Sequence, residues 1–218
     1  MNQLQIMFQE KKLHLRWLMI LFYFVGIIGF SCNSSRDLFM QLTPFVLMLS
    51  FITLLLMNAL EWNSKTILIY TSIFLFTFFV EVIGVNTGIL FGHYSYNSGL
   101  GVKIFNTPVL IGINWLMLSI IFSSLVSYIK LNDMMKIIAG TIGMMIYDLV
   151  LEHTAPLLDM WYWKDDQIPV LNYFTWFGLS FLIMTLLVKS GLSRHNPLAL
   201  TIVLCQLIFF VVVLIFSK

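Results

Sequence analysis

Three ionisable residues lie within one long apolar stretch of this chain. Asp148 and Glu152 are four residues apart, so on a helix their carboxyls share one face, one turn apart, and His153 follows directly. A further carboxyl, Glu81, lies within a second apolar stretch. Like charges at this spacing destabilise a helix, and an apolar environment raises the cost. Carboxyls in such surroundings favour proton transfer, in which a protonated acid donates and an ionised neighbour accepts.

The composition indicates a membrane protein. Of the 218 residues, 60% are hydrophobic and 10% are charged, whereas a soluble domain has roughly 25% charged residues. Because so few polar side chains cannot cover the chain in water, we expect the lipid bilayer to surround it. The net charge of +2 does not indicate a nucleic-acid partner. The two cysteines, Cys32 and Cys205, have neither metal-binding nor redox spacing.

Seven stretches are long enough to cross a bilayer, which takes about 20 mainly apolar residues. The sequence therefore predicts an all-α, polytopic membrane bundle, a single domain over 1–218 whose motifs fall within about 66–188. The expected helices span roughly residues 16–33, 38–60, 66–86, 108–129, 134–156, 169–188 and 196–216. The first stretch follows a basic segment and also resembles a signal peptide. Because the remaining chain is equally apolar, we expect this stretch to be a retained helix.

The distribution of basic residues predicts the orientation in the membrane. In this topology, eight Lys and Arg residues fall on the N-terminal side of the bilayer and four on the other. Cytoplasmic loops carry the excess of Lys and Arg, so we expect a cytoplasmic N-terminus, in the cell membrane if the protein is bacterial. The two longest loops, 87–107 and 157–168, then lie on the non-cytoplasmic face. Functional residues concentrate in such loops, so we look for the site there.

Polar residues gather at one depth of the expected bundle. At 1.5 Å per residue, Asp148 lies about 20 Å along its helix, beyond the midplane. Glu152, Glu81, Asn114 and Asn172 lie near the same end of their own helices. Four helices therefore bring polar groups to one half of the bilayer. Two simpler interpretations are interhelical hydrogen bonds and, for the outermost residues, solvation at the headgroups.

The two segments that carry the acids resemble each other. From Glu81 the chain reads EVIGVNTGILFGHYSY, and from Asp148 it reads DLVLEHTAPLLDMWYW, aligned without a gap. Acids, threonines and aromatic residues coincide in the pairs Glu81 and Asp148, Thr87 and Thr154, Tyr94 and Trp161, and Tyr96 and Trp163. This pattern predicts a parallel repeat of the helix pairs 66–86 with 108–129 and 134–156 with 169–188. The repeat would turn Glu81 and Asp148 toward a shared cavity.

At these residues the chain resembles the membrane-integral carotenoid biosynthesis family that includes the CruF-type carotenoid 1,2-hydratases. The first family signature corresponds to Glu81, Thr87-Gly88, Phe91-Gly92, Tyr94, Tyr96 and Leu100-Gly101. The second corresponds to Asp148-Leu149-Val150-Leu151-Glu152 with Trp161 and Trp163, and the third to Ile168-Pro169, Asn172 and Trp176. Two departures are Glu152, where the family has Asp, and His153, where it has a helix-ending Pro.

The resemblance implies hydration of the terminal C1–C2 double bond of a linear (psi) carotene end group. A carboxylic acid protonates the alkene, a tertiary carbocation forms, and water captures it without a cofactor. The expected catalytic residues are Asp148, Glu81 and Glu152. Residues expected to bind substrate, shield the cation or orient water are Asn86, Thr87, Tyr94, Tyr96, Asn114, His153, Trp161, Trp163, Asn172 and Trp176. Aromatic faces stabilise cations by roughly 0.5–2 kcal/mol, although aromatic residues also form belts at membrane interfaces.

Other functions remain open at this point. A membrane-integral lycopene-type cyclase would use the same protonation, and a proton-coupled transporter or binding protein would also place acids in the membrane. A retinal protein is disfavoured, because residues 197–216 contain no lysine. No paired histidines indicate a metal site, and we expect neither metal nor cofactor. The expected partners are a lycopene- or gamma-carotene-like substrate, lipid, and other enzymes of carotenoid biosynthesis.

Overall fold

The computed structural model describes residues 11–58 and 62–216, and within them it confirms the predicted helical membrane bundle. Seven helices are long and apolar enough to cross a membrane. They are α2 (Lys12–Ser31), α3 (Arg36–Leu56), α4 (Ser64–Thr87), α5 (Val109–Ser127), α6 (Asp133–Thr154), α7 (Val170–Lys189) and α8 (Ala199–Phe216). The protein is therefore a multi-pass membrane protein. Its helix ends differ from the predicted ones by a few residues.

Short polar residues, a left-handed glycine and prolines mark the ends of the helices that carry the site. The side chain of Asn63 accepts a hydrogen bond from the backbone N–H of Thr66 at the start of α4, and Asn132 begins α6 in the same way. Gly88, at φ 70°, ends α4 in the left-handed conformation that glycine adopts without strain. Pro108 and Pro169 directly precede α5 and α7.

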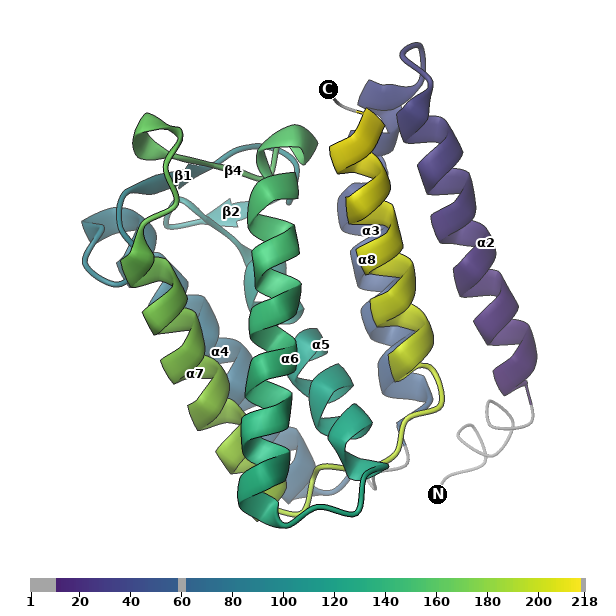
Figure 1. Ribbon diagram of the computed structural model, residues 1–218, viewed down its shortest axis with the longest axis vertical. Helices are drawn as coiled ribbons and strands as arrows, with labels where there is room; N and C mark the ends of the chain where they lie inside the picture. Colours follow the sequence, from purple (N-terminus) through teal and green to yellow (C-terminus); the bar gives the residue numbers. More distant parts are fainter. Residues whose placement is uncertain (1–10, 59–61, 217–218) are drawn as a thin grey trace.

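The helices pack around α5. Fourteen of its nineteen residues are buried, and it packs against α3, α4, α6, α7 and α8. Figure 1 shows α4 to α7 on one side of the molecule and α2, α3 and α8 on the other. The outer surface is apolar, with Phe174 72% and Leu68 67% exposed. Such a surface is unfavourable in water and suits the hydrocarbon of a bilayer.

Two pairs of short strands lie over one end of the bundle, where α4 and α6 end (Figure 1). β1 (Tyr94–Tyr96) pairs antiparallel with β4 (Trp161–Trp163), and β2 (Lys103–Ile104) pairs with β3 (Thr107–Pro108). Two 3-10 turns, η1 (Pro156–Leu158) and η2 (Lys164–Asp166), flank β4. The two long loops that were expected to carry function are thus ordered into one layer.

Candidate active site

The pairing of β1 with β4 aims four aromatic side chains into the bundle. Tyr94 lies opposite Trp163, and Tyr96 lies opposite Trp161. Because alternate residues of a strand face opposite sides, these four rings share one face of the ladder. Tyr96, Trp161 and Trp163 are buried, whereas Tyr162 on the other face is exposed. The strands therefore cover the ends of α4 and α6 with an aromatic layer.

The first carboxyl under this layer, Glu81 near the end of α4, accepts three hydrogen bonds. The hydroxyls of Tyr94 and Tyr96 donate to its Oε2 at 2.6 and 2.8 Å, and Nε1 of Trp115 donates to its Oε1 at 2.9 Å. Burial, together with the adjacent Glu81 charge, raises the pKa of Tyr94 and of Tyr96 well above the ordinary value. Both phenols therefore stay protonated and act as donors.

The second carboxyl, Glu152 near the end of α6, is surrounded in the same manner. Nε1 of Trp161 and of Trp163 donate to its Oε2 at 3.1 and 2.7 Å, and Nδ2 of Asn172 donates to its Oε1 at 2.9 Å. All three donors are N–H groups of neutral side chains. Hydrogen bonds to an ionised group are each worth about 1.5–3 kcal/mol, so this arrangement is suited to a negative charge.

Asp148 differs from both glutamates, because it is fully buried and has no hydrogen-bond partner within the described part of the chain. It lies one turn before Glu152 on α6. A buried carboxylate without donors is strongly disfavoured, whereas a protonated carboxyl is a neutral group. The surroundings of Asp148 therefore favour the form that carries a proton.

A cavity of about 20 Å³, room for about one water molecule, lies between the two glutamates. Its walls are Glu81, Phe91, Tyr94, Tyr96, Ile111, Glu152, Trp161, Trp163, Asn172 and Trp176. Trp176 stacks on Trp115, with ring centroids 3.8 Å apart and an interplanar angle of 24°. The cavity thus combines two carboxyls with aromatic surface. Asp148 is not among its wall residues; it lies one helical turn before Glu152 on α6.

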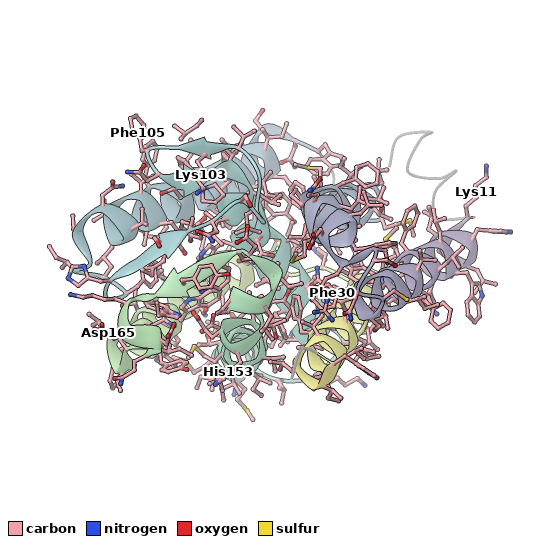
Figure 2. All side chains as sticks on the ribbon, turned by 90° about the horizontal axis from the view of Figure 1, so that it is seen from above. Lys11, Phe30, Lys103, Phe105, His153 and Asp165 are labelled. Atoms are coloured by element: carbon pink, nitrogen blue, oxygen red, sulfur yellow. The ribbon has the colours of Figure 1, made fainter. Side chains whose placement is uncertain are left out.

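Six of the ten predicted substrate-binding residues line this cavity, and four lie elsewhere. The side chain of Asn86 donates to the carbonyl of Phe105 in the neighbouring loop, and Thr87 bonds back to its own helix. Asn114 is buried in α5 outside the cavity wall. His153 is exposed at the outer edge of the bundle, where its Nδ1 contacts the carbonyl oxygen of Leu149 (Figure 2). These positions follow from helix phase, which turns Asn86, Thr87 and His153 outward.

The register of β1 and β4 supports the predicted parallel repeat. A shift of 67 residues converts the pair Tyr94–Trp163 into the pair Trp161–Tyr96, which is the other flanking pair of the ladder. This is the symmetry that a two-fold axis between the strands requires. α4 and α6 both end at this layer, so they cross the bundle in the same direction, as expected for an axis along the membrane normal (Figure 1).

The sequence analysis missed Trp115, which donates to Glu81. A signal for it exists, because α5 and its preceding proline read PVLIGINW and α7 with its proline reads PVLNYFTW. Pro108 matches Pro169 and Trp115 matches Trp176, now at a shift of 61 residues. The shift falls from 67 to 61 because the second loop lacks the additional β2–β3 hairpin. Trp115 and Trp176, whose rings stack, therefore occupy equivalent positions in the two repeats.

A contact between the two loops fixes the strand pair. Asp159 accepts hydrogen bonds from the side chains of Asn97 and Ser98, and although burial acts in the opposite direction, these bonds lower its pKa. The N–H of Gly99 donates to the carbonyl of Asp159 at 2.7 Å. A Cβ on Gly99 would lie 2.3 Å from the carbonyl oxygen of Leu158. The two loops can approach this closely only because residue 99 has no side chain.

We expect Gly99→Ala to lower stability, because the loops must separate to relieve the clash with a backbone carbonyl. Overpacking of this kind costs about 1–3 kcal/mol. Thermal unfolding of the purified protein in detergent measures the effect. Gly178→Ala is the matched control, since a Cβ there meets nothing within 4 Å. Equal unfolding temperatures for the two variants would contradict the tight contact.

Comparison with known proteins gives one finding that identifies a family. No curated protein and no solved structure matches the chain. A family model described as carotenoid biosynthesis protein matches residues 40–218, which is most of the chain and includes every residue of the cavity wall. A role in carotenoid biosynthesis, with contact to lipid and carotenoid, follows from this match. The chain belongs to the carotenoid biosynthesis protein family.

Proposed function

We propose that the protein is a carotenoid 1,2-hydratase that adds water to the terminal C1–C2 double bond of a linear carotene end group. The observation that carries the proposal is the cavity in which Glu81 and Glu152 face each other between aromatic walls, with Asp148 buried behind Glu152. A volume of about 20 Å³ has room for the one water molecule that the reaction consumes.

In the proposed reaction, the buried Asp148 holds the proton. It passes the proton to Glu152, one helical turn away, and Glu152 delivers it to the alkene. The carboxyl O–H bond breaks, a C2–H bond forms, and C1 becomes a tertiary carbocation. Glu81 stabilises the cation as the ionised carboxylate, and Trp176 contributes its ring face, for roughly 0.5–2 kcal/mol. Water then bonds to C1 and releases a proton to a carboxylate. The sum is alkene plus water, without any change of oxidation state.

The three carboxyls have different surroundings, and this difference supports their different roles. Glu81 and Glu152 each accept three hydrogen bonds, whereas Asp148 accepts none. Neighbouring acids whose environments favour opposite protonation states are typical of acid–base sites. In the orientation that the basic residues predict, the cavity lies in the non-cytoplasmic half of the bilayer.

Expression in a lycopene-producing bacterial host tests the proposal. We expect pigments heavier than lycopene by one or two waters, detected by mass spectrometry of the extract. A product of unchanged mass but new absorption would indicate cyclisation instead, because a neighbouring double bond then captures the cation. Unaltered lycopene, with the protein present in the membrane, would contradict hydration of this carotene end group.

A further inference from the structure

A larger apolar groove lies on the other side of the bundle, between α2, α3 and α8. Its volume is about 230 Å³, whereas that of the acid cavity is about 20 Å³. Six of its fourteen wall residues are aromatic, namely Phe22, Tyr23, Phe39, Phe45, Phe209 and Phe210. Val25 and Phe45 at its edge are 45% and 59% exposed, so the groove is open toward the bilayer.

The polar atoms at the bottom of this groove are already hydrogen-bonded within the protein. The hydroxyl of Tyr23 lies 3.0 Å from Oγ of Ser50, and the hydroxyl of Tyr147 donates to Oε1 of Gln206 at 3.0 Å. A ligand therefore meets hydrocarbon and ring faces. This surface suits a molecule without polar groups, and its aromatic rings favour a polarisable conjugated chain over a saturated one.

The groove and the acid cavity meet at two consecutive residues. Met160 lines the groove, and Trp161, the next residue and the first of β4, lines the cavity. The backbone of Met160 is held by Ala155 and Asn97, while its side chain is unbranched and flexible. Met160 and Trp161 therefore place the two spaces next to each other along the chain.

We propose that this aromatic groove holds the conjugated chain of the polyene whose end group enters the acid cavity. The inference rests on the proposed function for the identity of the ligand, since a long substrate reaches the small cavity with one end only. The groove supplies the adjacent aromatic surface for the remainder. It thereby selects elongated polyenes over short alkenes that carry the same end group.

Binding of lycopene to the purified protein in detergent tests the groove without relying on turnover. The readout is circular dichroism induced in the visible absorption band of lycopene. We expect Gly26→Leu to weaken binding at least tenfold, because the new side chain enters the groove from α2. A Cβ at Gly26 meets only Phe209, at 3.8 Å, so the helix tolerates the change. Gly178→Leu, on the outer face of α7, is the matched control and should bind as the unmodified protein does.

A second variant, on a different helix, tests whether weaker binding comes from filling the groove rather than from a distortion of α2 at Gly26. Thr43→Leu adds volume from the α3 wall and should also weaken binding. Unaltered binding in both groove variants, or no induced signal in the unmodified protein, would overturn the proposal. Equal displacement of lycopene by the saturated isoprenoid squalane would overturn the assignment to a conjugated chain.

Measuring water adducts in the same membranes separates this inference from the proposed function. If Gly26→Leu loses binding while the unmodified protein makes no adduct, the groove is supported and hydration is rejected. If all variants bind lycopene equally and form adduct equally, hydration is supported and the groove is rejected.

Discussion

Glu152→Gln is expected to abolish formation of the water adduct and to leave the bundle folded. Glutamine keeps the volume of glutamate but has no acidic proton to deliver. Loss of a general acid lowers a rate by about 10²–10⁴-fold. The new amide oxygen can still accept from Trp161 and Trp163, and Asn172 can rotate its own amide to accept from the new NH₂ group. The fold should therefore survive, and the measurement is adduct per unit of membrane-inserted protein.

Two further variants test whether the loss of activity is due to the missing carboxyl of Glu152. Glu152→Asp restores the carboxyl one methylene further from the cavity, and we expect it to recover part of the activity. Asp133→Asn removes a carboxyl that pairs with Lys189 at the exposed start of α6, and activity should not change. Full activity of Glu152→Gln would remove Glu152 from the acid role.

Asp148→Asn is expected to abolish the product without lowering the unfolding temperature. Asparagine has the shape and the neutrality of a protonated aspartic acid, so it fits the same buried position. It cannot pass a proton to Glu152, and the rate should fall within the same range of about 10²–10⁴-fold. If Asp148 were instead ionised and stabilised by unseen interactions, the variant would change the free energy of unfolding strongly. Thermal unfolding in detergent and pigment analysis of the same preparation measure both quantities.

Ser180→Ala is the control for Asp148, because Oγ of Ser180 is the other buried side-chain group without a partner among the described residues. This change should leave product formation as it is. Normal product formation by Asp148→Asn would show that the proton comes from elsewhere and would contradict proton transfer from Asp148 to Glu152.

The two halves of the site have the same architecture with different donors. Glu81 is bound by two tyrosines and a tryptophan, and Glu152 by two tryptophans and an asparagine. A phenol can accept as well as donate a hydrogen bond, whereas an indole N–H can only donate. The repeat therefore supplies two similar carboxyl sites, and the side chains around them make the sites chemically unequal.

The sequence by itself determined the bundle and the depth of its acids. A helix must satisfy its backbone hydrogen bonds within lipid, so each stretch of about 20 apolar residues predicts one crossing. Carboxyls are costly in that environment, which is why Glu81, Asp148 and Glu152 stand out without any structure. The repeat from Glu81 and from Asp148 also predicted that the aromatic pairs at 94–96 and 161–163 are equivalent.

Only the tertiary structure decided which acids face the cavity. The repeat pairs Glu81 with Asp148, but the rotation of α6 against its neighbours brings Glu152 to the wall and leaves Asp148 behind it. The pairing of β1 with β4 depends on contact between loops far apart in the chain, as does the hydrogen bond from Trp115 to Glu81. Sequence spacing defines the face of one helix, whereas a binding site depends on how several helices and loops are turned toward each other.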